Sequence, residues 1–347
     1  MISFVNDYSV IASPEVMDLM VKYNGEMNSP YSSDYHSQRA KELVLKKLKK
    51  DDAFVQIFSG GTQTNLIAAA AFLRPHEAII GVKTAHIMVH ETGAIEATGH
   101  KCIEVEGKDG KIRPEDIDLI CAPHNWDHAG ILTVKPRMVF ISQTTEVGSV
   151  YSAKELRALR ETCDKYNLLL YCDGARLASA LDCSDVDLAL LADLCDAFYI
   201  GGAKNGAMFG EMMIVTNEQL TEDLRYIAKQ RGGMLAKGFT LAIQFEALLT
   251  NDLYEKNGRH ANRMADILRE GLSKSEVEMT VYSPSNQIFA SFPNHILDRL
   301  KSEFVWETIS TPDEDNTEIR LVTSWYTKEE DCRYFVEKLL EYSSIKE

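Results

Sequence analysis

A lysine lies among small residues in the segment AFYIGGAKNGAMFG, residues 197–210. The apolar run at its start is typical of a buried strand, and the glycines around Lys204 let another backbone or a ligand approach closely. The segment itself contains no carboxylate that would account for the charge. Because lysine is almost never fully buried, one interpretation is a loop lysine between two strands. The other is a lysine whose amine forms a Schiff base with a carbonyl compound.

A Gly-rich turn follows another apolar run, in the segment SGGTQTNLIAAAAFL at residues 59–73. The backbone N–H groups of Gly61, Thr62 and Gln63, together with the Thr62 hydroxyl, would form a phosphate-binding turn at the start of a helix. Many helices start with Gly and Thr, so an ordinary capped helix is the alternative. The turn lacks the lysine of a nucleotide P-loop and the full glycine spacing of a dinucleotide site.

Asp173 ends a third apolar run, in the segment NLLLYCDGARL at residues 167–177. A carboxylate at the end of a buried strand is costly unless a cation meets it, and a protonated pyridine nitrogen is one such cation. The alternative is that Asp173 caps the helix that follows and pairs with Arg176.

A phosphate-binding turn, an aspartate for a ring nitrogen and a lysine at a third strand end are the parts that a pyridoxal 5'-phosphate site requires. The protein must bind, orient and electronically tune that cofactor. In this interpretation Lys204 holds the aldehyde as an imine, and Asp173 keeps the ring nitrogen protonated so that the ring withdraws electrons from the substrate's Cα. The sequence therefore predicts pyridoxal 5'-phosphate as the cofactor.

Strand-like apolar runs alternate with helical patterns over the first two thirds of the chain. Residues 152–167 are typical of a helix, with Ser152 as N-cap and Glu155 completing a capping box. The connection length suits a right-handed crossover between parallel strands. Strands that are apolar along their whole length require helices on both faces, so we predict an α/β fold with a mainly parallel open sheet. The predicted strands are residues 53–58, 77–82, 138–143, 167–173 and 196–202.

The pattern changes near residue 240. One long helical stretch is expected over residues 240–273, followed by short, closely spaced strands and a last helix over 328–344. We therefore predict a large cofactor-binding α/β domain with an N-terminal segment over residues 1–240. A linking helix and a small α+β C-terminal domain are expected over 241–347. The short strands are expected at residues 278–283, 286–292, 304–310 and 319–325.

Composition excludes several classes of protein. The chain has 347 residues and a formal net charge of −15, which argues against a nucleic-acid or anionic-membrane partner. No apolar run is long enough to span a bilayer, and the first residues show no signal or transit peptide. The seven cysteines are scattered, so reduced thiols and a cytoplasmic location are expected. The segment HIMVHE at residues 86–91 lacks the glutamate placement of a zinc-protease helix, so no metal is predicted.

Several segments together carry a family resemblance. The sequence resembles the low-specificity L-threonine aldolases of the beta-eliminating lyase/threonine aldolase family, within the aspartate-aminotransferase-like, fold-type I pyridoxal-phosphate enzymes. The resemblance runs from FVNDYS near the N-terminus to EIRLVTSW near the C-terminus. The motifs that carry it are GGTQTN, AHIMVHETGAIEATGH, DGARL and GGAKNGAMFG.

The resemblance implies roles for six residues. It implies that His86 stacks on the cofactor ring and that Glu91 is the glutamate that follows this histidine in the family. Asp173 matches the aspartate at the ring nitrogen, and Lys204 the Schiff-base lysine. The two arginines that bind the substrate carboxylate match Arg176 and Arg320.

The implied reaction is the retro-aldol cleavage of L-threonine and L-allo-threonine to glycine and acetaldehyde. A bidentate clamp on the α-carboxylate selects which bond lies perpendicular to the ring and therefore breaks. His86, His90 and Glu91 are the residues for proton transfer. A second active-site histidine of many family members is missing from ISQTTEVGSVYS, where Thr145 lies near its position, so His90, His128 or water remain open as the base.

Other departures bear on the substrate and on assembly. Asn6, before the matched Asp7, replaces the serine that often helps to bind the carboxylate. The segment KQRGGMLAKG at residues 229–238 offers Arg231 or Lys237, in place of the family's arginine, to a neighbour's phosphate. Active sites of this fold type usually take groups from two subunits, which implies a homodimer or homotetramer.

Two other classes of function remain open from the sequence. The same cofactor site serves other lyases, other aldolases and aminotransferases, because fold and cofactor do not decide the reaction. A non-catalytic protein that binds pyridoxal phosphate or an amino acid is the second class. The complete set of residues favours an enzyme acting on a small amino acid.

Overall fold

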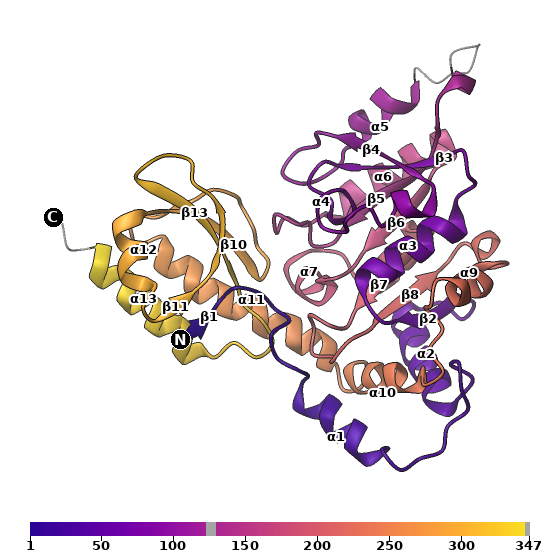
Figure 1. Cartoon of the computed structure of the whole chain (residues 1–347), viewed down its shortest axis with the longest axis horizontal. Coiled ribbons are helices and arrows are strands. Elements are labelled where there is room, and N and C mark those ends of the chain that lie inside the picture. The colour runs from indigo at the N-terminus through magenta and orange to yellow at the C-terminus, as the bar shows by residue number, and fades with distance from the viewer. Residues whose placement is uncertain (123–129, 344–347) are drawn as a thin grey trace.

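The computed structural model describes residues 1–122 and 130–343. The chain forms a larger part built on a seven-stranded sheet and a smaller part built on a four-stranded sheet (Figure 1). Both described ends of the chain lie in the smaller part (Figure 1). None of the helices in these two ranges is long and apolar enough to cross a membrane.

The seven-stranded sheet is mainly parallel. Only β8 runs antiparallel to its neighbours, β2 and β7. Strands β3, β6, β7 and β8 are buried along their whole length, as a sheet covered on both faces requires. The predicted α/β fold is confirmed, although β4 and β8 were not among the predicted strands. In order across the sheet the strands are β2 (Phe54–Phe58), β8 (Glu211–Val215), β7 (Ala197–Gly201), β6 (Leu169–Asp173), β5 (Lys135–Ser142), β3 (Glu77–Val82) and β4 (Lys101–Val105).

Helices connect these strands, and the best-defined crossover is the predicted one. In α6 the Ser152 hydroxyl accepts from the Glu155 N–H, while Glu155 Oε2 accepts from the Ser152 N–H at 2.8 Å. Two orphan N–H groups at the helix start are thereby satisfied. The α-helices of the larger part are α1 (Pro14–Lys22), α2 (Tyr35–Leu48), α3 (Gly61–Phe72), α4 (His86–Val89), α5 (Pro114–Cys121), α6 (Ala153–Tyr166), α7 (Leu177–Cys183), α8 (Leu188–Leu194), α9 (Leu224–Gln230) and α10 (Phe239–Leu248).

The single helical stretch expected over residues 240–273 is wrong, because the structure divides it into α10 and α11 (Leu253–Leu272). Asn251 and Asp252 interrupt it with φ angles of 55° and 56°. This left-handed region is one that Asn and Asp tolerate better than most residues. Helix α11 then runs from the larger part to the smaller one and contacts both α7 and α13 (Glu329–Ser343) (Figure 1).

The smaller part has the predicted α+β character. Its sheet has the order β12 (Glu307–Ser310), β13 (Asn316–Val322), β10 (Gln287–Pro293) and β9 (Glu278–Met279), and α12 (Asn294–Leu300) and α13 accompany it. The single strand expected over residues 304–310 is wrong. Its first half, β11 (Phe304–Val305), pairs instead with β1 (Ile2–Ser3) in a separate two-stranded sheet.

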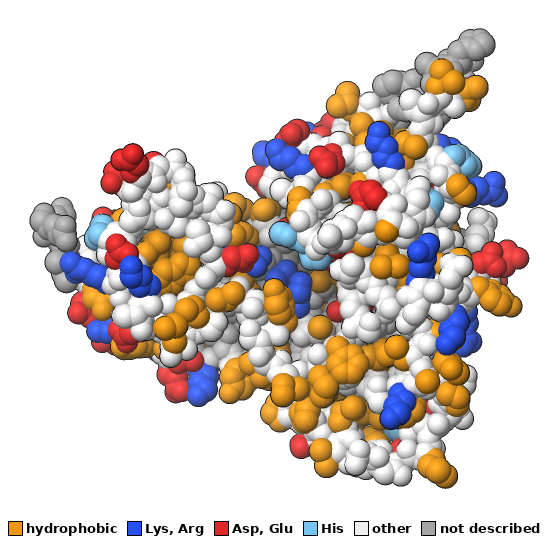
Figure 2. Space-filling model, in the orientation of Figure 1, with side chains coloured by type: hydrophobic (Ala, Val, Ile, Leu, Met, Phe, Trp, Pro, Cys, Tyr) orange, Lys and Arg blue, Asp and Glu red, His pale blue; other side chains and the backbone are white. Residues whose placement is uncertain are grey.

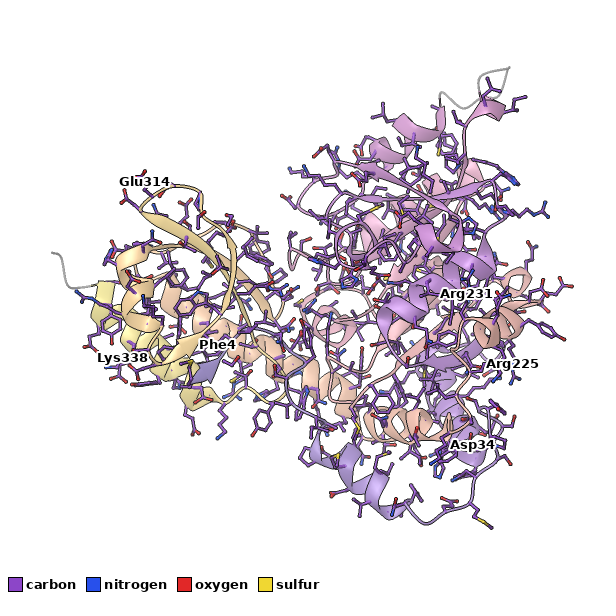
Figure 3. The ribbon with its side chains drawn as sticks, viewed as in Figure 1. Phe4, Asp34, Arg225, Arg231, Glu314 and Lys338 are labelled. Atoms are coloured by element: carbon purple, nitrogen blue, oxygen red, sulfur yellow. The ribbon has the colours of Figure 1, made fainter. Side chains whose placement is uncertain are left out.

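Each part has its own hydrophobic core. The larger core surrounds the seven-stranded sheet, and the smaller one forms between α11, α13 and the four-stranded sheet. Phe4, labelled in Figure 3, belongs to the smaller core, where it packs edge-on against Phe335 at 5.5 Å between ring centroids. The N-terminal residues therefore pack with the C-terminal part of the chain. The domain boundary between residues 240 and 241 stays a prediction.

Candidate active site

A cavity of about 930 Å³ lies where the two parts of the chain meet. It opens at the carboxyl ends of β3, β5, β6 and β7, the edge at which open α/β sheets collect ligands. Figure 2 shows blue and pale-blue side chains gathered in the hollow between the two parts. Eight of the predicted site residues line it: Gly61, Thr62, His86, His90, Asp173, Arg176, Lys204 and Arg320.

Two predicted residues lie behind the cavity wall rather than in it. The Gln63 side chain accepts from the Ser59 hydroxyl at 2.8 Å and donates to the Arg231 carbonyl at 3.4 Å. The Glu91 carboxylate is buried against His86. Gln63 therefore has only its backbone N–H to offer to a ligand in the cavity. Glu91 lies against His86 and is not among the residues that line the cavity.

Asp173 ends β6 and is only 4% exposed. The Tyr199 hydroxyl donates to its Oδ1 at 2.5 Å, and the Asn65 amide donates to its Oδ2 at 3.0 Å. The alternative in which Asp173 pairs with Arg176 is wrong, because that arginine binds Asp7 instead. The carboxylate is thus held rigidly at the cavity wall and remains available to a cation in the cavity.

A buried hydrogen-bonded chain joins Asp173 to His86. Asn65 donates to both Asp173 and Glu91, and Glu91 Oε1 lies 2.8 Å from His86 Nδ1. Burial alone lowers the pKa of His86, but the hydrogen bond to Glu91 and the charge of Asp173 outweigh it, so its pKa is raised. For His90 burial and repulsion by His86 act together and lower the pKa. The two adjacent imidazoles therefore differ in their tendency to carry a proton.

Lys204 follows β7 and is half-buried in the cavity. Burial and the nearby charge of Arg176 lower the pKa of its amine. A lowered pKa increases the share of neutral amine, which is the nucleophilic form. Beside it the buried Glu211 accepts a hydrogen bond from the Gly202 N–H at 2.9 Å, and burial raises the pKa of this carboxyl to about 8. Lys204 does lie on a loop between two strands, β7 and β8, as the first interpretation has it, but it lines the cavity.

The start of α3 has the features of a phosphate-binding turn. Its N-cap is Gly60, no side chain caps it, and Gly61 and Thr62 line the cavity. A Cβ on Gly61 would lie 3.0 Å from the Tyr199 hydroxyl, so a larger residue would crowd the Asp173 site. Free N–H groups, a buried carboxylate and an amine thus share one cavity. This donor set fits pyridoxal phosphate.

Arg176 is bound tightly by an acidic side chain of the N-terminal segment. Its Nε and Nη2 donate to the two oxygens of Asp7 at 2.7 and 3.2 Å. Asn286 donates to the same carboxylate at 2.9 Å. Burial raises the pKa of Asp7, but the charges of Arg176 and Lys204 outweigh it and the pKa is lowered. Asp7 therefore stays ionised and competes with any substrate carboxylate for Arg176.

Arg320, on β13, is held more loosely. Its Nη1 donates to Gln287 Oε1 at 3.2 Å, and its Nη2 forms an ion pair with Glu307. Its Nε is buried without a hydrogen-bond partner. A donor left unpaired in a cavity wall costs free energy unless a ligand accepts a hydrogen bond from it. A substrate carboxylate is a suitable acceptor. Glu307 had no signal in the sequence, because only the small sheet brings it to Arg320.

The segment after β5 contains Thr145, which lies near the position of the missing histidine. Thr145 is buried, its hydroxyl lies 2.8 Å from that of Ser149, and it is not among the residues that line the cavity. The next residue, Glu146, lines the cavity. Sequence reasoning missed it, although a glutamate just after a buried strand was a usable signal. His128 lies outside the described residues.

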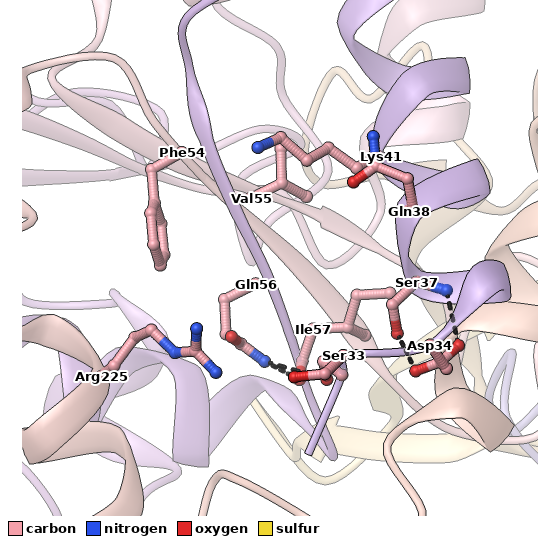
Figure 4. Close-up of a pocket in the computed structure, with 11 residues that line it drawn as sticks. Ser33, Asp34, Ser37, Gln38, Lys41, Phe54, Val55, Gln56, Ile57 and Arg225 are labelled. Atoms are coloured by element: carbon pink, nitrogen blue, oxygen red, sulfur yellow. Dashed lines mark hydrogen bonds between the residues drawn. The ribbon is translucent and has the colours of Figure 1, made fainter. Parts of the chain in front are cut away.

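A second cavity, of about 320 Å³, lies beside the edge strand β2 (Figure 4). Its lining is polar, and the Ser37 hydroxyl and backbone N–H both donate to Asp34 there. It contains none of the predicted site residues. The chemistry therefore identifies the larger cavity as the active site.

Comparison with known proteins agrees with this fold and identifies a family. Residues 7–292 match the beta-eliminating lyase family. A low-specificity L-threonine aldolase from Pseudomonas aeruginosa is 34% identical, over 76% of either chain. A threonine aldolase structure from Leishmania major is 43% identical with a TM-score of 0.96, and covers 99% of this chain and 100% of its own. Aspartate aminotransferase from Thermus thermophilus, at 16% identity, shares the fold with a TM-score of 0.70, over 99% of this chain and 91% of its own.

The chain belongs to the beta-eliminating lyase family, and its fold is that of the aspartate-aminotransferase-like enzymes. It is accordingly a pyridoxal-phosphate-dependent lyase. The cofactor predicted from the sequence is confirmed.

Proposed function

We propose that this lyase cleaves L-threonine and L-allo-threonine to glycine and acetaldehyde. The observation that carries the proposal is a single cavity holding Lys204, Asp173 and the unpaired Nε of Arg320. Together these groups suit a cofactor and an amino-acid carboxylate. The likeness to threonine aldolases of Pseudomonas aeruginosa and Leishmania major supports this choice among lyases.

The cofactor side of the cavity is assigned as follows. Lys204 is the point of covalent attachment, and Asp173 faces the ring nitrogen. His86 would hold the ring of the cofactor from one side, and the N–H groups of residues 61–63 would bind its phosphate. When bound, pyridoxal phosphate supplies an electron-withdrawing ring that accepts the electron pair of the broken Cα–Cβ bond.

The substrate side depends on the arginines. Arg320 binds the α-carboxylate through its free Nε and through the nitrogen now paired with Glu307. Arg176, held by Asp7, adds positive charge beside it. A clamped carboxylate sets the rotation about the bond between Cα and nitrogen, and this rotation decides which bond at Cα breaks. The clamp also imposes the L configuration at Cα.

Assembly and location belong to the same proposal. We propose a homodimer, paired into a homotetramer, in which Arg231 or Lys237 of one subunit reaches the phosphate site of another. Both side chains lie on the exposed loop between α9 and α10, and Arg231 is labelled in Figure 3. The seven free cysteines support a reducing, cytoplasmic location. A monomeric mass in solution with full activity would overturn the assembly.

Product analysis tests the reaction. Purified holoenzyme is incubated separately with the four stereoisomers of threonine, and glycine and acetaldehyde are quantified. We expect both products from the two L isomers, with kcat/KM values within about a hundredfold, or about 2.7 kcal/mol, of each other. Release of 2-oxobutyrate and ammonia would instead identify a β-eliminating reaction. Amino-group transfer to a 2-oxo acid would identify an aminotransferase.

A further inference from the structure

Cleavage of a β-hydroxy amino acid requires a group that takes the hydroxyl proton, and His86 is poorly suited to this. Its Nδ1 is occupied by Glu91, and its pKa is raised despite burial, by the hydrogen bond to Glu91 and the charge of Asp173. His90 is exposed, at the outer end of the short helix α4. The cavity wall contains a third group, Glu146, to which no role has yet been given.

Glu146 is fixed from two strand ends. Its Oε1 accepts from the His86 backbone N–H at 2.9 Å, just after β3, and from the Ser142 hydroxyl at 2.7 Å, at the end of β5. Both hydrogen bonds go to Oε1. They hold the carboxylate in place, and neither of them uses Oε2. The side chain is only partly buried, and its free surface faces the cavity that it lines.

The surroundings raise the pKa of the Glu146 carboxyl above its ordinary value of 4.5. Burial raises the pKa of Glu146, the charge of Asp173 on β6 raises it further, and the two hydrogen bonds to Oε1 work in the opposite direction, with a net increase. The other titratable groups near it are His86 on α4, Arg176 at the start of α7, and the buried Tyr151 and Cys172. A general base is most effective when its pKa lies close to the working pH.

We propose that Glu146 is the catalytic base that takes the β-hydroxyl proton of the substrate, an inference that rests on the proposed threonine cleavage. The O–H proton passes to a carboxylate oxygen of Glu146, and the O–H electron pair forms the C=O bond of acetaldehyde. The Cα–Cβ bond breaks, and its electron pair stays with the fragment that becomes glycine. A proton then returns to Cα and completes glycine, so that atoms and charge balance.

A carboxylate on this wall also accounts for the predicted tolerance at Cβ. Threonine and allo-threonine place the hydroxyl on different sides once the α-carboxylate is clamped. A carboxylate presents two oxygens, either of which can accept a proton. One carboxylate with two oxygens therefore serves both isomers.

The alternative is a purely structural role, in which Glu146 holds His86 through its backbone N–H. That role predicts weaker binding of every amino-acid ligand and a lower melting temperature when Glu146 is changed. It predicts no change in the pH dependence of the chemical step. The two roles are therefore separable by experiment.

The test compares Glu146→Gln with the wild type and with Glu96→Gln, an exposed glutamate outside the cavity. For Glu146→Gln holoenzyme we expect kcat for L-threonine to fall about 100- to 1000-fold. Glycine, which has no β-hydroxyl, should bind with a Kd within about threefold of wild type, read from the cofactor absorbance. The Glu96→Gln control should match the wild type both in kcat for L-threonine and in Kd for glycine.

The pH profile supplies a second measurement. The base must be ionised, so wild-type kcat/KM should rise with pH through the raised pKa of Glu146 and then level off. This limb should disappear in Glu146→Gln. Glu146→Asp, which keeps the carboxylate, should recover at least about tenfold of the lost kcat and restore the limb.

The outcomes distinguish the two proposals. If wild-type enzyme releases no acetaldehyde from threonine, both fail. If it does, and Glu146→Gln keeps more than about a third of kcat, only the role of Glu146 is overturned. Equal losses in glycine affinity and kcat, or loss of folding with no recovery in Glu146→Asp, would also overturn it in favour of the structural role.

Discussion

The two sides of the cavity are built differently. On the larger part, Asp173, Asn65, Glu91 and His86 form a continuous buried chain of hydrogen bonds. On the smaller part, Arg320 rests on an ion pair with Glu307 and keeps one buried donor unpaired. In the first side the residues orient one another and the unpaired buried atom of the chain is an acceptor, Glu91 Oε2, whereas the second leaves a cationic donor, Arg320 Nε, without a partner.

The difference between the two sides corresponds to how long the cofactor and the substrate each stay bound. A cofactor that remains bound over many turnovers benefits from groups that are already oriented, since no reorganisation is needed at each cycle. A substrate arrives and leaves at every turnover. An ion pair at the edge of a small sheet gives the arginine a partner that a substrate carboxylate can replace.

Lys204→Ala should have the largest effect, because this lysine lies in the cavity that the two sides share. We expect activity to fall at least about 10⁴-fold, since covalent catalysis is lost. We also expect no cofactor to remain attached after borohydride reduction and denaturation, as measured by mass spectrometry. Lys301→Ala, on the surface of the smaller part, is the control. Attached cofactor in the Lys204 variant would show that another residue is the anchor.

Asp173→Asn tests the preorganised side. An amide keeps the size of the side chain and still accepts from Tyr199, but it cannot stabilise a protonated ring nitrogen. We expect kcat to fall about 100- to 1000-fold while the melting temperature changes by a few degrees. Circular dichroism melting and steady-state kinetics measure the two quantities. Near-normal turnover would remove Asp173 from the cofactor site.

Arg176→Gln should act mainly on folding. It leaves Asp7, which is 3% exposed, without its cationic partner, at a cost of about 3 kcal/mol. Pairing with Arg176 lowers the pKa of Asp7 below its ordinary value of 3.8. The stability that Arg176→Gln removes is therefore present above pH 3.8, and it disappears as the pH falls below that value. Urea unfolding at two pH values measures this pH-dependent loss of unfolding free energy. Arg259→Gln, in an exposed pair, should change stability by less than about 1 kcal/mol.

Arg320→Gln should act mainly on substrate binding. We expect KM for L-threonine to rise about 10- to 100-fold, corresponding to one lost charged contact, with little change in unfolding free energy. If instead Arg320→Gln lowers stability as much as Arg176→Gln does, the contrast between the two sides is wrong.

Glu307→Gln should have the smallest effect, and in the opposite direction. Removal of the internal carboxylate leaves Arg320 free for the substrate, so we expect KM to fall by about two- to fivefold at unchanged kcat. Glu314→Gln, at an exposed turn labelled in Figure 3, is the control. A higher KM would mean that Glu307 holds Arg320 in position rather than competing for it.

The sequence by itself determined the elements and the residues at their ends. Continuous apolar runs form parallel strands that must be covered on both faces, so their carboxyl ends meet at one edge. This pattern alone predicts that Asp173, Lys204 and the turn at residues 61–63 belong to one site. The capping box of α6 was equally readable, because its partners lie three residues apart.

The tertiary structure decided which partners these residues have. Asp7 binds Arg176 across 169 positions of sequence, and Asn65 joins Asp173 across 108. Glu307 meets Arg320 only because β12 pairs with β13. Such contacts depend on the packing of distant elements, which local composition does not encode. The contacts of Glu146 with His86 and Ser142 likewise depend on the ends of β3 and β5 coming together in the folded chain.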